Sequence, residues 1–405
     1  MKGPLSGRRV LDISRAISGP YGAMILADLG AEVIHVEPPE GEISRFRAGP
    51  NYKGESFHYL SWNRNKKNIV LDFSTKSGRE ALFDLVKISD ILWNNFRPGS
   101  MERLGADYET LKEINPRLIY VSITGYGPSG PFAGRPAFDV AILGHSGVLS
   151  LTGEPEGVPV RPGPPIADMG GGIFAAIGAL AALSDRERTG KGRKIDISMQ
   201  DVCISLLSYN FCQYFITGIA PKPLDHSGHA FSVPYGVYKT KKGYIALGPC
   251  WPRIARVIGA DWMIDDPRFK DWEGRDKHRK ELNRIIEEHL AQAEAEDWVN
   301  LFEAEDIPAG LIKNIEEVVA DPQALHQKMI LSLTHPLGGE IKLAGNPIKM
   351  DGLSGEGSTA PPTLDQHGYE ILSGLLGYSE EKIKKLRQEE KEHTEERLSH
   401  VRKVW

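Results

Sequence analysis

Short apolar runs alternate with amphipathic stretches through the first half of the chain. The apolar runs predict buried strands at 9–13, 32–36, 68–71, 91–93, 118–123 and 194–198. The segments between them have the periodicity of helices, at 21–29, 77–88, 107–114, 172–186 and 199–217. Strands that alternate with helices predict an α/β fold, with a doubly wound parallel sheet covered on both faces.

The pattern changes near residue 218. The stretch GIAPKPLDHSGHAFSVP is rich in Pro, Gly and His and has no clear period, so it predicts a loop at a domain boundary. A hairpin and three helices are predicted after it, at 235–239, 244–248, 251–259, 275–291 and 294–304. A chain of 405 residues usually divides into domains. We expect a large domain, formed by 1–217 and by 331–405 with its charged terminal helix, and a small α+β domain at 218–330.

Composition limits the class of partner. The formal net charge is −5, so nothing favours binding to nucleic acid or to an anionic membrane. Three scattered cysteines without a CxxC pair indicate a reducing compartment. The N-terminus lacks an apolar signal core, and the longest apolar stretch, 173–183, is shorter than the about 20 residues that span a bilayer. We therefore expect a cytoplasmic protein without a nucleic-acid or membrane partner.

Motifs for common cofactors and for a serine nucleophile are incomplete. The first turn reads ISGPYG rather than GxGxxG, which argues against NAD, and no GxxxxGK[ST] loop occurs. The stretch GHSGV has Val148 where a nucleophile elbow needs glycine. Asp225, His226 and His229 offer metal ligands, but nothing nearby completes a set. We expect no metal site and no tightly bound cofactor.

The stretch PPIADMGGG places Asp168 after two prolines and before three glycines. Two interpretations are open. The carboxylate caps the free N–H groups of a helix start, or the bare glycine backbone lets a substrate approach it, beside N–H groups that favour negative charge. Side chains able to bind phosphate cluster at predicted strand ends, at 63–67, 94–98, Arg103 and Arg135.

Taken together, these stretches resemble the class III CoA-transferase family, which includes formyl-CoA and carnitine CoA-transferases and alpha-methylacyl-CoA racemase. The resemblance covers nearly the whole chain and rests on SGPYGAMILADLGAEVIHVEPPEG (18–41), NRNKKNIVLDF (63–73), NNFRPGSMERLG (94–105), IADMGGG (166–172) and RTGKGRKIDISMQD (188–201). It implies an acyl-CoA and a carboxylic acid as substrates. It also implies an interlocked homodimer.

The resemblance implies that Asp168 is the nucleophile, which attacks the acyl-CoA and then carries CoA as an aspartyl thioester. Oxyanion donors would be backbone N–H groups of Gly170 and Gly171, or of a lid loop with Gly228 and His229. The coenzyme A-binding positions of the family, to which we add Arg135 from the basic cluster, correspond to Ile17, Ser18, Leu71, Asp72, Phe73, Ser74, Asn95, Phe96, Arg97, Arg103, Ala137, Phe138 and Asp139.

One position separates the two chemistries of the family. Racemases carry GHD where this chain has Ala137-Phe138-Asp139. Because Phe138 can neither accept nor donate a proton, a two-base racemase would lack one of its bases. We therefore expect a CoA-transferase, with a racemase or a related acyl-CoA isomerase as the alternative. A protein that only binds its ligand would not need the Asp168 carboxylate.

Overall fold

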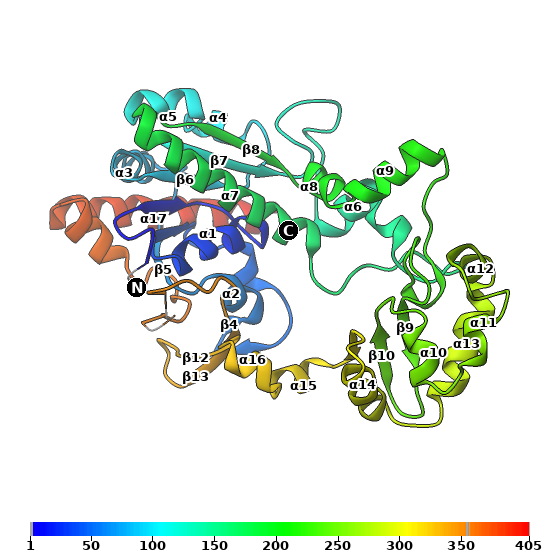
Figure 1. The fold of residues 1–405 in the computed structure, drawn as a ribbon. Coiled ribbons are helices and arrows are strands. Elements are labelled where there is room, and N and C mark those ends of the chain that lie inside the picture. The colour runs from blue at the N-terminus through cyan, green and yellow to red at the C-terminus, as the bar shows by residue number, and fades with distance from the viewer. Residues whose placement is uncertain (1–2, 354, 356, 405) are drawn as a thin grey trace. The chain divides into compact units, whose positions relative to one another are not determined.

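The computed structural model describes residues 3–353, 355 and 357–404. The chain forms two compact units (Figure 1). The large unit comprises Met1–Ser146, Pro164–Leu206 and Leu325–Trp405, and the small unit comprises Gly147–Gly163 and Leu207–Ala324. The large unit is therefore built from both ends of the chain. The sequence analysis had placed Gly147–Gly163 in the large domain. The ranges predicted for that domain, 1–217 and 331–405, also include Met1, Lys2, Ser354, Glu356 and Trp405, which lie outside the described residues.

The large unit contains a six-stranded parallel sheet in the order β5-β2-β1-β6-β7-β8. This confirms the predicted α/β fold, and every predicted strand in this half of the chain is present. Their bounds are β1 Arg9–Asp12, β2 Glu32–Glu37, β5 Lys66–Val70, β6 Ile91–Asn94, β7 Ile119–Thr124 and β8 Lys194–Ser198. The chain builds outward from β1 in one direction through β2 and β5, and in the other through β6, β7 and β8.

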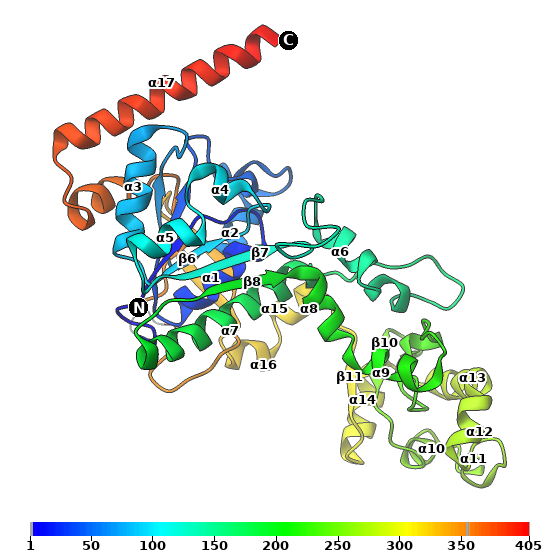
Figure 2. The ribbon, with the colours of Figure 1, turned by 90° about the horizontal axis from the view of Figure 1, so that it is seen from above.

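Helices cover both faces of this sheet (Figure 2). Alternate side chains of the strands pack against different helices. Leu11, Ile34, Leu92 and Tyr120 share one buried cluster with residues of α3, α5, the π-helical turn η4 and the C-terminal helix α17. On the other face, Trp93 and Ile123 meet α1 and α7. The bounds of these elements are α1 Ser18–Asp28, α3 Lys76–Lys87, α5 Tyr108–Ile114, α7 Ile166–Thr189, η4 Glu370–Leu375 and α17 Glu380–Val404.

Helices α1 and α7 pack closely enough for their backbones to touch. A Cβ atom added at Gly172 would lie 2.6 Å from the Ser18 carbonyl oxygen, and one at Gly22 would lie 2.5 Å from the Trp93 ring and 2.6 Å from the Gly172 carbonyl oxygen. Gly170 and Gly171 are also buried, against Val202 and Met199 respectively. The three glycines after Asp168 therefore have a packing function inside α7. Their role as oxyanion donors stays a prediction.

Among the described residues, α7 alone is long and apolar enough to cross a membrane by length and composition. The apolar window of 18 residues is longer than the stretch 173–183. Half of that window is buried within the protein, where α7 packs against α1, the helix α8 (Met199–Leu206) and the strands β7 and β8. A core helix satisfies the same test, so its composition is weak evidence for a membrane span.

The small unit has a three-stranded antiparallel sheet in the order β11-β10-β9. The predicted hairpin corresponds to β9 and β10, and Tyr238, Phe269 and Phe302 are fully buried in the core that the sheet forms with the surrounding helices. The predicted helix at 199–217 is in fact α8 and α9, which are separated at Leu207. The bounds are β9 Gly236–Lys239, β10 Tyr244–Leu247, β11 Ala309–Leu311, α9 Ser208–Thr217, α10 Arg253–Val257, α11 Trp262–Asp265, α12 Trp272–Lys277, α13 Arg279–Leu290, α14 Ala295–Ala304 and α15 Ile315–Val319.

Several further elements were not predicted, and most of them span too few residues to show a period. They are the hairpin strands β3 Asn51–Tyr52, β4 Glu55–Ser56, β12 Ile330–Thr334 and β13 Glu340–Ala344, the helices α2 Phe57–Trp62, α4 Ser100–Leu104, α6 Asp139–His145 and α16 Pro322–His326, and the turns η1 Ile43–Phe46, η2 Val148–Leu151 and η3 Asp225–Ser227.

Replacing Gly172 by Ala is expected to destabilise the fold, because the new methyl group meets backbone atoms of Ser18 and Gly22 that cannot move independently. Overpacking of this kind costs about 1–3 kcal/mol in the free energy of unfolding, measurable by urea denaturation. Gly374→Ala is the matched control, since nothing lies within 4 Å of its added Cβ. Equal stability of the two variants would contradict the close backbone contact.

Candidate active site

A cavity of about 540 Å³ lies at the carboxyl ends of the parallel strands. Its wall includes Arg15–Ser18, which follow β1, Asn95–Pro98, which follow β6, and Ile123–Gly125 at the end of β7. Strands β1 and β6 are neighbours at the point where the winding of the sheet reverses. Ligands of open α/β sheets bind at such a point, because the loops that leave the two strands diverge there.

Asn95 joins the two loops that form this part of the wall. Its Oδ1 accepts a hydrogen bond from the Arg15 N–H at 2.9 Å, and its Nδ2 donates to the Arg15 carbonyl at 2.8 Å and to Ser18 Oγ at 3.1 Å. Asn95 therefore fixes the loop after β1 against the loop after β6. Coenzyme A binding at Asn95 stays a prediction.

Asp168 lines the same cavity from the first turn of α7 and is half-buried. The helix begins at Ile166 after Pro165, and the side chain of Pro165 makes no capping hydrogen bond. Asp139, at the start of α6, caps the helix instead. Its Oδ1 accepts hydrogen bonds from the N–H groups of Ala167 at 2.9 Å and Asp168 at 3.3 Å. The capping function that the sequence left open for Asp168 thus belongs to Asp139.

The cavity is rich in positive charge. Arg15, Arg47, Arg97 and Arg135 line it, and within the part of the chain that the structure describes none of them forms an ion pair with a carboxylate. Asp168 is the only acidic residue among the described residues of the wall. Guanidinium groups left without carboxylate partners in a concave site are suited to bind phosphate or carboxylate groups of a ligand.

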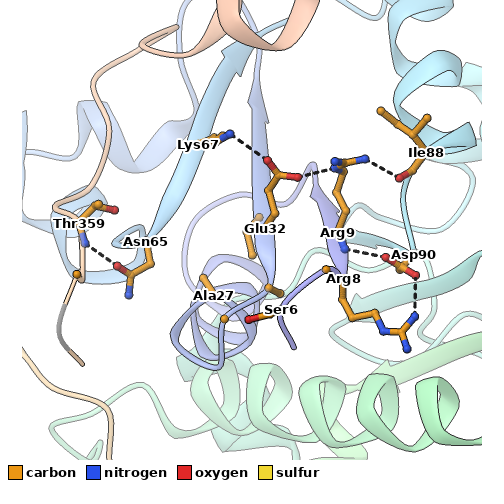
Figure 3. A pocket seen from close by; sticks show the side chains of 15 residues that line it. Ser6, Arg8, Arg9, Ala27, Glu32, Asn65, Lys67, Ile88, Asp90 and Thr359 are labelled. Atoms are coloured by element: carbon orange, nitrogen blue, oxygen red, sulfur yellow. Dashed lines mark hydrogen bonds and ion pairs between the residues drawn. The ribbon is translucent and has the colours of Figure 1, made fainter. Parts of the chain in front are cut away.

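A second pocket, of about 500 Å³, lies at the opposite, amino ends of the strands (Figure 3). Its charged side chains neutralise one another. Arg9 pairs with Glu32 at 2.7 Å, Lys67 pairs with Glu32 at 2.9 Å, and Asp90 accepts from the Arg9 N–H at 2.7 Å and pairs with Arg8 at 3.7 Å. Because its charges are already paired, this pocket offers less to an anion than the cavity at Asp168.

The cavity brings together many of the predicted site residues. Those that line it are Ile17, Ser18, Asn95, Phe96, Arg97, Arg135, Ala137, Phe138 and Asp168. Those that lie outside its lining are Leu71, Asp72, Phe73, Ser74, Arg103, Asp139, Gly170, Gly171, Gly228 and His229. Gly228 and His229 belong to the small unit, where Arg279 donates to the His229 carbonyl at 2.9 Å. Their role as a lid stays a prediction.

The turn after β5, with four of the outlying residues, is held by the C-terminal helix. Asp72 pairs with His393 at 2.7 Å, and its N–H donates to Glu390 at 3.0 Å. The Ser77 N–H donates to Glu389 at 3.0 Å. These contacts engage the carboxylate of Asp72 and its N–H with α17. Coenzyme A binding at Leu71 to Ser74 stays a prediction.

The structure adds three cavity residues with ionisable side chains that the sequence analysis had not selected: Arg15, Arg47 and His58. Arg15 stands two residues before the predicted Ile17, so the motif around the first turn could have included it. Arg47 follows η1, and His58 lies in the first turn of α2. The segment that contains them has no recognisable motif. Only the fold brings this segment to the carboxyl ends of the strands.

A network of buried charged side chains supports the cavity wall. Lys66 and Asp12 are fully buried and pair at 3.0 Å, and Lys66 Nζ also donates to the Pro20 carbonyl in the first turn of α1. His35 Nδ1 lies 3.1 Å from Asp12. Burial alone would raise the pKa of Asp12, but Lys66 and His35 outweigh it and hold that pKa well below its ordinary value.

The same layer fixes the loop with Ala16. Glu42 is buried, and its Oε2 accepts from the N–H groups of Ala16 and Ser44, each at 3.0 Å. Ala16 has a φ of 63°, a left-handed conformation that costs free energy for a residue with a side chain. Glu37 binds Arg45 at 2.8 Å and accepts from the Glu42 N–H at 2.8 Å. The network therefore holds a strained turn of the cavity wall in place.

The described residues contain no group of three or more His, Cys, Asp or Glu that could hold a metal ion.

The sequence model of CoA-transferase family III matches residues 5–368. The chain belongs to this family. Succinyl-CoA:glutarate CoA-transferase from Homo sapiens is 35% identical over 388 residues, which cover 95% of this chain and 88% of that protein.

Two further relatives support the family assignment. Acetyl-CoA:oxalate CoA-transferase from Acetobacter aceti is 35% identical over 374 residues, covering 91% of this chain and 94% of that protein. A solved structure of a CaiB/BaiF family protein from Brucella suis is 33% identical, with a TM-score of 0.82, and covers 93% of this chain and 100% of the other. The predicted resemblance is confirmed, and this chain is a family III CoA-transferase enzyme.

Replacing Lys66 by Met in this CoA-transferase is expected to destabilise it by about 3–5 kcal/mol, because the Asp12 carboxylate is left buried without its cation. Lys112→Met, which removes the exposed pair with Glu109, is the control and should leave the stability almost unchanged. Chemical denaturation measures both free energies of unfolding. Similar losses in the two variants would show that the Lys66 pair is not a special support of the fold.

Proposed function

We propose that this enzyme moves coenzyme A from an acyl-CoA donor to a carboxylic acid, with Asp168 as the nucleophile that carries CoA between them. The observation that carries the proposal is the cavity itself: one carboxylate at the start of α7 faces a wall with four arginines, none of which forms an ion pair with a described carboxylate. The relatives named above transfer CoA between pairs of acids, as their names state. The same reaction class fits a carboxylate nucleophile in a cationic cavity.

The proposed reaction begins when an Asp168 oxygen attacks the thioester carbon of the donor. The carbon–sulfur bond breaks, the CoA thiolate leaves with the electron pair, and a mixed anhydride remains. The thiolate then attacks the Asp168 carbonyl carbon, releases the donor acid as a carboxylate and forms an aspartyl-CoA thioester. The acceptor carboxylate repeats these steps in reverse order. Each step exchanges one acyl bond for another, so no redox or metal chemistry takes part.

The capping contact to Asp139 positions the nucleophile. Asp139 Oδ1 binds the backbone N–H of Asp168 itself and of its neighbour Ala167, which fixes the first turn of α7 without occupying the Asp168 side chain through these bonds. The Asp168 carboxylate is held at the cavity wall by a rigid helix rather than by a loop. Arg15 and Arg97, which follow β1 and β6, are placed to bind phosphate groups of CoA.

Phe138 supports transfer over racemisation. It lines the cavity and is 61% exposed, so the position taken by a histidine in racemases holds a side chain without a titratable group. A second base is needed to return a proton to the other face of an alpha carbon. The transferase therefore remains the proposed activity.

We also propose that the enzyme works as a homodimer in the cytoplasm. In the large unit, Ile173, Phe174 and Ile177 expose apolar surface along α7, and Ile177 is 56% exposed. In the small unit, Phe215 and Ile216 are more than 70% exposed on α9. Apolar surface of this extent favours coverage by another protein surface, and a second copy of the chain satisfies it.

Replacing Asp168 by Ala is expected to abolish CoA transfer, by about a thousandfold or more, because the nucleophile is lost while the fold is kept. Asp201→Ala is the matched control, since Asp201 is an exposed residue of α8 outside the cavity. The assay follows acyl-CoA products by mass spectrometry, with circular dichroism to check folding. An Asp168→Ala enzyme that keeps most of its turnover would refute the assignment.

Hydroxylamine added during turnover is expected to modify Asp168, because an anhydride or thioester carbonyl is reactive and a resting carboxylate is not. Peptide mass mapping locates the adduct, and the reaction without acyl-CoA serves as the control. A racemase would behave differently in deuterated water, by exchanging the alpha proton of a 2-methylacyl-CoA. Rapid exchange without an adduct at Asp168 would favour the alternative activity.

The native enzyme is expected to have the mass of a dimer in light scattering, and Ile177→Asp is expected to shift it toward monomer, because a charge is placed on the proposed apolar interface. Ile88→Asp, at the end of α3, is the control and should leave the mass unchanged. A wild-type monomer at all concentrations tested would contradict the proposed assembly.

A further inference from the structure

Two arginines of the cavity, Arg15 and Arg47, have different aromatic neighbours. The Arg15 guanidinium lies 5.0 Å from the centre of the Phe96 ring, in the loops after β1 and β6. The Arg47 guanidinium lies 6.0 Å from the centre of the Phe138 ring, on the segments after η1 and before α6. Arg47 therefore belongs to a different part of the wall from the arginine nearest the switch point of the sheet.

The part of the wall with Phe138 is directly connected to the nucleophile. Phe138 precedes Asp139, and Asp139 Oδ1 binds the N–H groups of Ala167 and Asp168. Arg47, which lies beside the Phe138 ring, is thus related to the acyl-transfer end of the cavity through one short chain of contacts. Arg47 and Asp168 also line the same cavity.

Nothing in the described residues neutralises Arg47. Its guanidinium forms no ion pair with any described carboxylate. The imidazole of His58 lines the same cavity, and its pKa is lowered first by burial and then by the positive charge of Arg47. This end of the cavity therefore has an unbalanced positive charge.

Apolar surface accompanies that charge. Ile43 is 49% exposed and Phe138 is 61% exposed, and both line the cavity with Arg47 and Asp168. These side chains match a ligand with a hydrocarbon segment and a second anionic group. The hydrocarbon segment would contact Ile43 and Phe138, and the second anionic group would bind Arg47, while the reacting group meets the Asp168 carboxylate. A simple fatty acid would leave the guanidinium without an anion.

We propose that Arg47 binds the distal carboxylate of a dicarboxylic acid while the other carboxylate reacts at Asp168, with Ile43 and Phe138 against the hydrocarbon segment. The inference rests on the proposed CoA transfer and adds the residue that recognises the accepting acid, since the relatives' names already include the dicarboxylic acids glutarate and oxalate. Arginine matches a carboxylate through two parallel hydrogen bonds, so it selects for a charge at that end of the acid. A site built for such a group rejects an analogue that lacks it.

The test compares glutarate with its monomethyl ester as acceptors, since the ester keeps the chain and one carboxylate but removes the distal charge. When CoA passes through an aspartyl thioester, kcat/KM for the acceptor reports only the second half-reaction, so the donor does not affect the comparison. The quantity of interest is the ratio of kcat/KM for glutarate to that for the ester. It is measured in wild type, Arg47→Met and Arg47→Lys.

Wild type is expected to prefer glutarate, and Arg47→Met is expected to lower the ratio by at least about tenfold through loss of the glutarate rate alone. Arg47→Lys should retain part of the preference, because it keeps the charge but not the paired geometry. Arg79→Met is the matched control. Arg79 is an exposed arginine of α3 outside the cavity, and its replacement should leave the ratio unchanged.

Three results would overturn the inference. A ratio that Arg47→Met leaves unchanged shows that Arg47 does not recognise the acceptor. A raised KM for the acyl-CoA donor with equal losses for both acids assigns Arg47 to a CoA phosphate instead, and the proposed transferase function stands in both cases. A wild-type enzyme that transfers CoA to neither acid nor to any other carboxylic acid contradicts the proposed function, and the inference falls with it.

Discussion

The contact on which the site depends is the one between the backbones of α1 and α7. Gly22 and Gly172 allow the Ser18 and Gly172 carbonyls to approach where any side chain would collide. This contact sets the first turn of α1, with Ile17 and Ser18, beside the first turns of α7, with Asp168. Backbone packing, together with the Asp139 cap on the first turn of α7, therefore helps to set the position of Asp168 relative to the loops after β1 and β6.

The charged side chains of the large unit fall into two sets: one supports the fold, and the other is available to bind a ligand. Below the cavity, Lys66, Asp12, His35, Glu37 and Arg45 are buried and bind one another, so that each desolvated charge has a partner. At the cavity surface, four arginines form no ion pair with a carboxylate of the described residues. The first arrangement fixes the geometry of the wall, and the second leaves binding capacity for an anionic ligand.

Much of the fold could be predicted from the sequence, because the strands of the parallel sheet are buried on both faces and appear as apolar runs. The strand predicted at 68–71 begins earlier, at Lys66. The charged side chain of Lys66 can be buried there because it pairs with Asp12. That pairing joins distant segments and leaves no local pattern. Asp168 could be singled out from its neighbours, whereas the capping function of Asp139 and the place of Arg47 depend on contacts between segments far apart in the chain.

The return of the chain end to the sheet has a consequence for biosynthesis. Ile371, Leu372, Ile383 and Leu386 complete the buried cluster that covers one face of the large sheet, and α17 binds the turn after β5 through Asp72. A ribosome releases these residues after the whole small unit. The small unit can therefore fold while the sheet of the large unit still exposes an apolar face, and contacts between the two chain ends close late. Truncation or slow synthesis of the last segment would leave that apolar face uncovered for longer and favour aggregation of the nascent enzyme.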